Sequence, residues 1–196
     1  ILRTSVGVRI LLEEMQKDSG FVLPEGFCDN LIKAAPMHDI GKIGVNDMIL
    51  QKPGRFTIDE FEIMKTHTTI GYKICMNDLK LRPYAAGPLY HHEALNGTGY
   101  PHGVIASKIP YEAQIIRVAD EFEAITAKRQ YKTHVGVVDA LNIMIDNARP
   151  AVPTNVKQGF RFFAMPGVGK IDKKILKALF KVIIDDTEYE IVARTD

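Results

Sequence analysis

Apolar residues recur at helical spacing through most of the chain, and this periodicity constrains the fold more than any other feature. In residues 1–18, for example, Val8, Leu11, Leu12 and Met15 fall on one face of a helix. The same spacing predicts further helices at about 27–39, 57–74, 83–93, 110–127, 134–148 and 171–186. Alternating strand patterns are scarce, so the sequence predicts an all-α helical bundle.

The length and the charge of the chain limit how many domains it can form and which partners it can bind. A chain of 196 residues is long enough for one sizeable core and short for two. We therefore expect a single domain over 1–196, with its main motifs in 1–145 and an irregular loop at about 149–170. The formal net charge of +1 gives no electrostatic reason to expect DNA as a partner.

The cysteines and the hydropathy of the chain indicate the cellular compartment in which the protein works. Cys28 and Cys75 lie far apart without C-x-x-C spacing, so neither a disulfide framework nor a thiolate zinc site is expected. The sequence shows no apolar run near the roughly 20 residues that span a bilayer, and no signal peptide. These features predict a cytoplasmic chain without a membrane segment. Because helical spacing begins at Ile1 without a capping residue, we expect a piece of a longer protein.

Histidine and aspartate side chains form the strongest chemical signal. They lie on or at the ends of several predicted helices, and they are His38, Asp39, His67, His91, His92 and Asp120. Each residue alone has an ordinary alternative as a cap, a surface residue or a hydrogen-bonded core residue. Together they predict a metal site in the bundle core, because imidazole and carboxylate without thiolate suit iron, manganese, zinc or nickel, and facing helices can present them inward.

Six short motifs occur in a characteristic order, and the chain resembles the HD-GYP family over about residues 1–145. That family comprises bacterial metal-dependent phosphodiesterases that act on cyclic di-GMP. The motifs are HDIGKIG (38–44), MKTH (64–67), HHE (91–93), GTGYP (97–101), RVADEFEAIT (117–126) and KRQYK (128–132). We therefore expect an HD-domain bundle with the GYP loop at the rim of its site.

The resemblance implies two divalent metal ions, iron or manganese, or three in the intact protein. Asp39 would bridge them, with the other ligands divided as His67, His91 and His92 on one ion and His38 and Asp120 on the other. One carboxylate has two oxygens and can hold two cations, which together lower the pKa of a water that attacks phosphorus.

Other residues are expected to contact the substrate. Lys42 lies close enough to the HD pair to neutralise a phosphate oxygen, although a solvated surface lysine is the alternative. By resemblance, Arg129 and Lys132 contact phosphates, while Gly99 and Tyr100 lie in the GYP loop at the rim. That loop would also dock a diguanylate cyclase domain, and an upstream sensory or receiver domain would regulate the protein.

The chain departs from the family in two places. Where the family has Arg-Trp-Asp after HHE, this chain has Ala94, Leu95 and Asn96, so we expect an apolar rim that weakens partner docking. A further family ligand His would stand immediately before Ile1. A chain that begins at Ile1 should therefore hold the His38/Asp120 ion weakly and be a poor phosphodiesterase.

Three functional hypotheses remain at this point. The leading hypothesis is hydrolysis of cyclic di-GMP, and the alternatives are a catalytically impaired HD-GYP signalling or binding module and an HD-type phosphohydrolase for another nucleotide. The stretch MPGVGKID lacks the first glycine and the Ser or Thr of a P-loop. His102 and His134 match no ligand position, and we expect ordinary loop or surface residues there.

Overall fold

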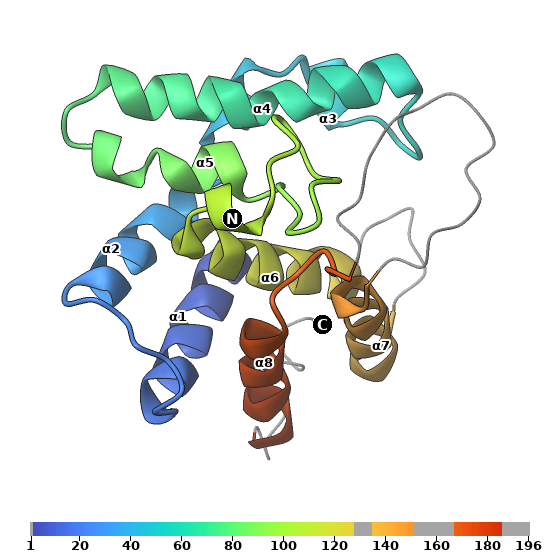
Figure 1. Ribbon diagram of the computed structural model, residues 1–196. Helices are drawn as coiled ribbons and strands as arrows, with labels where there is room; N and C mark the ends of the chain where they lie inside the picture. Colours follow the sequence, from blue (N-terminus) through green and yellow to red (C-terminus); the bar gives the residue numbers. More distant parts are fainter. Residues whose placement is uncertain (1, 128–134, 151–166, 186–196) are drawn as a thin grey trace.

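The computed structural model describes residues 2–127, 135–150 and 167–185 (Figure 1). These residues confirm the predicted all-α class, because their only ladder pairing is an isolated antiparallel bridge between Asn96 and Ile105. The α-helices are α1 (Leu2–Lys17), α2 (Phe27–Ala34), α3 (Asp47–Leu50), α4 (Ile58–Asn77), α5 (Ala86–Tyr90), α6 (Tyr111–Thr126), α7 (Val137–Ala148) and α8 (Lys173–Asp185). Within these ranges no helix combines the length and apolarity needed to cross a membrane.

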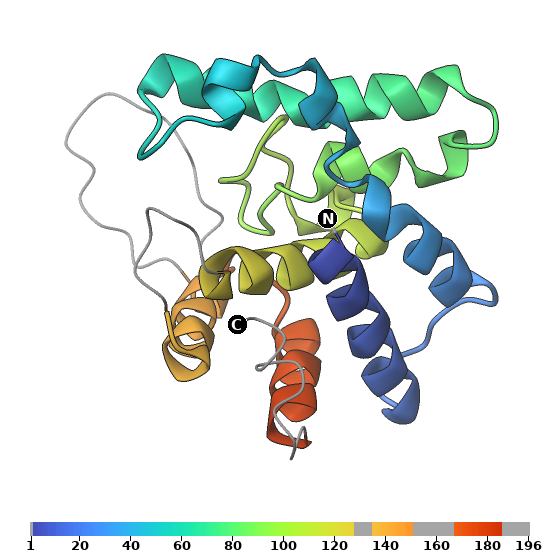
Figure 2. The same ribbon diagram turned by 180° about the vertical axis from the view of Figure 1, so that it is seen from behind.

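Helix α6 runs through the middle of the structure and separates two groups of elements (Figures 1 and 2). On one side α1, α7 and α8 pack against it; on the other lie α5, the loop after α5 and the long helix α4. The predicted loop at 149–170 is largely outside the described residues, and the extent of a single domain over 1–196 stays a prediction.

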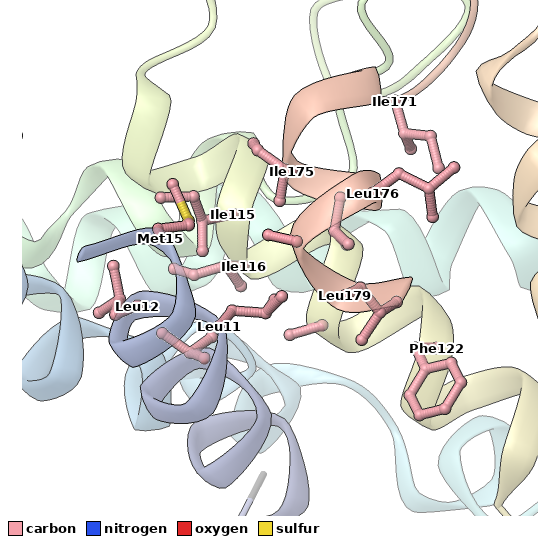
Figure 3. Packing of buried hydrophobic residues seen from close by; sticks show 14 of the residues in the cluster. Leu11, Leu12, Met15, Ile115, Ile116, Phe122, Ile171, Ile175, Leu176 and Leu179 are labelled. Carbon is pink, nitrogen blue, oxygen red and sulfur yellow. The ribbon is translucent and has the colours of Figure 1, made fainter. Parts of the chain in front are cut away.

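The main hydrophobic core lies where α1, α6 and α8 meet (Figure 3). Leu11, Leu12 and Met15 of α1 face Ile115 and Ile116 of α6, and all five are at most 1% exposed. Burying each such side chain contributes about 1.5–3 kcal/mol relative to its exposure. This core fixes α6 as the rigid element from which Asp120 reaches the other side of the structure.

Helix α4 begins as the sequence predicts. Thr57 is its N-cap and accepts a hydrogen bond from the Glu60 backbone N–H at 3.3 Å, while the Glu60 carboxylate accepts one from the Thr57 N–H at 2.6 Å. This capping box satisfies two backbone donors that a helix start leaves free. The register of α4 then places His67 on its buried face.

Two predicted helices are shorter than expected, and both differences occur at the histidine motifs. The helix predicted at 27–39 ends at Ala34, and the HD pair lies between the 3₁₀ segments η1 (Ala35–Met37) and η2 (Ile40–Gly44). The helix predicted at 83–93 is reduced to η3 (Arg82–Tyr84) and α5. Helix α5 ends at Tyr90, whose carbonyl accepts a hydrogen bond from the Glu93 N–H three residues later, as in a turn. Beyond it, the His92 and Glu93 carbonyls accept from Tyr100 and Arg117 and not from a following helical turn.

Gly41 explains why η2 can lie directly against α4. A Cβ atom at Gly41 would stand 1.8 Å from the His67 carbonyl oxygen and 2.4 Å from the Gly71 nitrogen. Both are backbone atoms, which cannot move aside as a flexible side chain would. Only glycine therefore allows the HD segment to approach the helix that carries His67.

We expect Gly41→Ala to lower the free energy of unfolding by about 1–3 kcal/mol or more, because overpacking against backbone forces the two segments apart. Gly7→Ala in α1 is the matched control, since a Cβ there would meet only the Ala119 Cβ at an ordinary 3.5 Å, and it should not lower the stability because alanine favours a helix over glycine. Urea unfolding of both variants measures the difference. Equal stability of the two variants would contradict this account of the contact.

Candidate metal centre

The six predicted donor residues converge from four parts of the fold. His38 and Asp39 lie between η1 and η2, His67 is on α4, the two other histidines follow α5, and Asp120 is on α6. One donor atom from each of four residues lies within 4.8 Å of the others, and these residues are Asp39, His67, His91 and His92. His38 Nε2 lies 3.4 Å from Asp120 Oδ1, which joins the remaining two residues to the cluster.

The two oxygens of Asp39 face different neighbours. Oδ1 lies 3.5 Å from His67 Nε2 and 3.9 Å from His91 Nε2. Oδ2 lies 3.3 Å from His38 Nε2 and 2.5 Å from the Lys42 ammonium. A carboxylate placed between two donor sets in this way has the geometry needed to bridge two cations.

Backbone carbonyls set the tautomers of three histidines. The Nδ1–H groups of His38 and His67 donate to the carbonyl oxygens of Ala35 and Met64, each at 2.7 Å. His91 Nδ1 lies 3.0 Å from two carbonyl oxygens one turn earlier in α5. Because Nδ1 carries the proton in the neutral ring, Nε2 presents its lone pair to the cluster, as a metal-ligating imidazole does.

Those Nε2 atoms lack the partners that would satisfy them within the protein. His67 Nε2 and His91 Nε2 lie 3.4 Å apart, where two lone pairs would face each other. His38 Nε2 is buried and makes no hydrogen bond, although two carboxylate oxygens lie within 3.4 Å. A cation among these atoms would remove both conflicts, so the residues fit divalent metal ions.

Burial keeps most of the imidazoles neutral. Burial lowers the pKa of His91 to about 3, and it lowers the pKa values of His67 and His92 as well. For His38, burial also lowers the pKa, but Asp120 and Asp39 outweigh it and raise the pKa to about 9. A proton on His38 therefore takes the position beside the two carboxylates that a metal ion would otherwise fill.

The carboxylates of Asp39 and Asp120 are ionised, because positive charges lie beside them. Burial raises the pKa values of Asp39 and Asp120, but the neighbouring His38, helped by Lys42 in the case of Asp39, holds both below their usual range. The site thus combines two ionised carboxylates with the neutral imidazoles of His67, His91 and His92, and only His38 has to release a proton before it can bind a metal ion.

A profile for the HD domain matches residues 8–152, which is most of the chain. The chain belongs to the HD-domain family. It is 48% identical over 112 residues to a cyclic di-GMP phosphodiesterase of Thermotoga maritima, covering 56% of this chain and 30% of that protein. It is 39% identical over 133 residues to the cyclic di-GMP phosphodiesterase response regulator RpfG of Xanthomonas campestris pv. campestris, covering 64% of this chain and 35% of that protein.

A third relative has a different named substrate. The chain is 38% identical over 122 residues to the 3'3'-cGAMP-specific phosphodiesterase 3 of Vibrio cholerae serotype O1, covering 62% of this chain and 26% of that protein. The chain thus spans about a third or less of the length of these curated relatives.

Gly99 and Tyr100 lie directly beside the histidines of this HD domain. A Cβ at Gly99 would stand 2.2 Å from the Ala94 nitrogen, so the GYP loop, which we define as residues 97–104, packs on the backbone of the HHE motif. The Tyr100 ring stacks on the His92 ring with centroids 4.7 Å apart and an angle of 27° between the planes. Burial also raises the pKa of the Tyr100 hydroxyl, which therefore stays protonated.

The expectation of an apolar rim after HHE is wrong. Ala94, Leu95 and Asn96 are 2%, 8% and 2% exposed, because the GYP loop folds over them. Leu95 packs with Ile109 and Ala113 in a small second core, so the apolar substitution fills the interior instead of altering an outer surface.

Some expectations concern residues beyond the donor cluster. His102 lies exposed in its loop, as expected. Arg129, Lys132 and His134 fall outside the described residues, so their expected roles stay predictions. Sequence reasoning gave no role to Glu93, although its charge beside a glycine-rich loop was a usable signal; its carboxylate is buried and accepts hydrogen bonds from that loop.

The raised pKa of His38 predicts a pH-dependent stability of the chelator-treated protein. Its folded pKa of about 9 exceeds the value of about 6.5 in an unfolded chain. The stabilisation is therefore complete below about pH 6.5 and is lost as pH rises toward 9. Urea unfolding of wild type and His38→Gln at pH 6 and pH 9 should show a stability difference that shrinks with rising pH. A difference that stays constant or grows would contradict a shared proton at this site.

Proposed function

We propose that this chain is a metal-dependent phosphodiesterase domain that hydrolyses cyclic di-GMP. The observation that carries the proposal is the position of Asp39, whose two oxygens face two separate sets of donors. The Thermotoga and Xanthomonas relatives, both named as cyclic di-GMP phosphodiesterases, support this choice of substrate. A module that only binds the nucleotide would not need six converging metal donors, which argues against the impaired-module alternative.

The donors divide between two ions, which we propose to be iron or manganese. Asp39 Oδ1 would hold one ion together with His67, His91 and His92, and Oδ2 would hold the other together with His38 and Asp120. Ions bound there would supply the usual chemistry of such centres, a lowered pKa of water and polarisation of a phosphoryl oxygen. Asp39 and Asp120 would supply two negative charges that offset part of the positive charge of the ions. The buried imidazoles would keep bulk water away from the ions on the protein side of the centre.

Lys42 would act on the substrate. Its ammonium already reaches Asp39 Oδ2, and its side chain is 43% exposed, so it extends from the buried centre to the solvent. An ammonium in this position can neutralise a phosphate oxygen of the bound dinucleotide. We assign a contact with the substrate to Gly99 and Tyr100 on the rim, and phosphate contacts to Arg129 and Lys132.

The proposal also covers the partners, the regulation and the location of the protein. The GYP loop would dock a diguanylate cyclase domain, an upstream sensory or receiver domain would control turnover, and the protein would work in the cytoplasm. The relative named for 3'3'-cGAMP makes that dinucleotide the competing substrate. The two substrates differ in one base, so a direct comparison of their rates decides between them.

Asp39→Ala and Lys42→Ala test the proposal as a pair. Asp39→Ala should abolish turnover and remove metal together, because it deletes the only proposed bridging ligand. Lys42→Ala should retain metal and lower kcat for cyclic di-GMP by about 10²–10³-fold, in line with the loss of one charge-stabilising donor. Metal analysis and turnover are measured on the same anaerobic preparations.

The exposed Lys33 on α2 supplies the control, and Lys33→Ala should match wild type. Loss of metal in Lys42→Ala would mean that its role is misassigned. A metal-loaded wild type that hydrolyses 3'3'-cGAMP faster than cyclic di-GMP would replace the proposed substrate, and one that hydrolyses neither would refute the proposed function.

A further inference from the structure

A buried carboxylate lies next to the donor cluster without belonging to it. Glu93 is 1% exposed, and its Oε1 accepts hydrogen bonds from the backbone N–H groups of His102 at 2.7 Å and Gly103 at 3.1 Å. Its Oε2 accepts a third from the Val104 N–H at 3.1 Å. Hydrogen bonds to an ionised carboxylate are roughly twice as strong as neutral ones, so these three bonds hold the end of the GYP loop firmly.

The beginning of the same loop is held by the backbone. The Tyr100 N–H donates to the His92 carbonyl at 3.2 Å. Gly99 lies so close to the HHE backbone that a Cβ added there would stand 2.5 Å from Glu93 Cα. Tyr100 therefore lies between two anchored points, both of which lead back to the HHE motif. Its ring has little freedom to leave the face of His92.

Arg117 joins this anchor to α6. Its Nη1 donates to the Glu93 carbonyl at 3.1 Å, and its Nη2 lies 3.5 Å from Glu121 Oε2. Arg117 is three residues before Asp120 on the same helix, so one set of contacts connects the GYP loop, the HHE motif and the helix that carries a proposed metal ligand. The loop is thereby positioned relative to the metal centre rather than to the surface.

The anchored loop forms one wall of a cavity of about 650 Å³. Lys65 and Thr66 of α4 line the opposite wall, and Tyr100 and His102 belong to the loop wall. The Lys65 ammonium lies 5.7 Å from the centre of the Tyr100 ring. Movement of residues 102–104 would therefore change both the shape of this cavity and the position of Tyr100.

We propose that Glu93 is a positioning residue, whose carboxylate holds residues 102–104 so that Tyr100 stays on the His92 ring and is presented to a cyclic dinucleotide. The effect on substrate rests on the proposed function, whereas the effect on the loop does not. Glu93 acts through Tyr100 and touches neither the metal nor the substrate itself.

Glu93→Gln tests the proposal with a small change in shape. The amide oxygen can still accept the bonds from His102 and Gly103, but the amide NH₂ would face the Val104 N–H. We expect KM for cyclic di-GMP to rise about tenfold while kcat changes less than twofold and metal content is unchanged. In a Tyr100→Ala background, Glu93→Gln should raise KM no further, because the residue through which it acts is gone.

Glu14→Gln is the matched control, because Glu14 is a second buried glutamate, 5% exposed and paired with Lys17 and Lys181 away from the loop. It should lower Tm without changing KM. A Glu93→Gln variant that also lowers only Tm, or whose effect on KM adds fully to that of Tyr100→Ala, would overturn the positioning role. If Glu93→Gln does not fold, Glu93→Asp takes its place, since it keeps the charge but withdraws the carboxylate from the loop.

A fluorescence measurement separates this proposal from the proposed function. The chain has no tryptophan, so Tyr100→Trp introduces a single reporter on the loop. Adding Glu93→Gln should increase acrylamide quenching of that tryptophan at least twofold, while adding Glu14→Gln should not. Unchanged quenching would refute the role of Glu93 in holding the loop, whatever the enzyme hydrolyses. Increased quenching in a protein without turnover would leave the loop role intact and count against the function alone.

Discussion

The carboxylate of Asp39 lies where three parts of the fold that are separate in the sequence meet. Its Oδ1 faces the histidines of α4 and of the HHE motif, and its Oδ2 faces His38 and Lys42. Gathering so many polar groups in a buried site is unfavourable unless they are paired or bound to cations. The rest of the structure therefore has to hold these groups together, and its close backbone contacts do so.

Two glycines make those contacts. Gly41 brings the HD segment against α4, and Gly99 brings the GYP loop against the HHE backbone, each at a distance that no Cβ would allow. The large apolar core under α6 provides the stability that offsets the desolvation of the site. Core and site thus lie on opposite sides of α6, which contributes apolar residues to the first and Asp120 to the second.

The sequence predicts the main helices and the histidine and aspartate residues of the site, because both leave a pattern in the order of the residues. Helical periodicity follows from burial, so α1, α4 and α6 were predictable, and the motifs named the six histidine and aspartate residues that converge in the structure. Their grouping around the two oxygens of Asp39 came from resemblance and needed coordinates to be measured. The early end of the helix before HHE was not predictable, because apolar spacing does not show that the HHE carbonyls bond outside a helix, to Tyr100 in the loop and to Arg117 on α6. The burial of Leu95 was missed because a family comparison of single letters does not show which side of a loop faces the interior.

The bridging of two cations by Asp39 is the proposal on which the others depend. Anomalous diffraction from crystals of the metal-loaded protein, recorded at the absorption edge of the bound metal, tests it most directly. Two peaks are expected about 3.5–4 Å apart, one beside Asp39 Oδ1 with His67, His91 and His92, and a weaker one beside Oδ2 with His38 and Asp120, which offers fewer protein ligands. A single peak at full metal loading, or two peaks of which Asp39 touches only one, would contradict it.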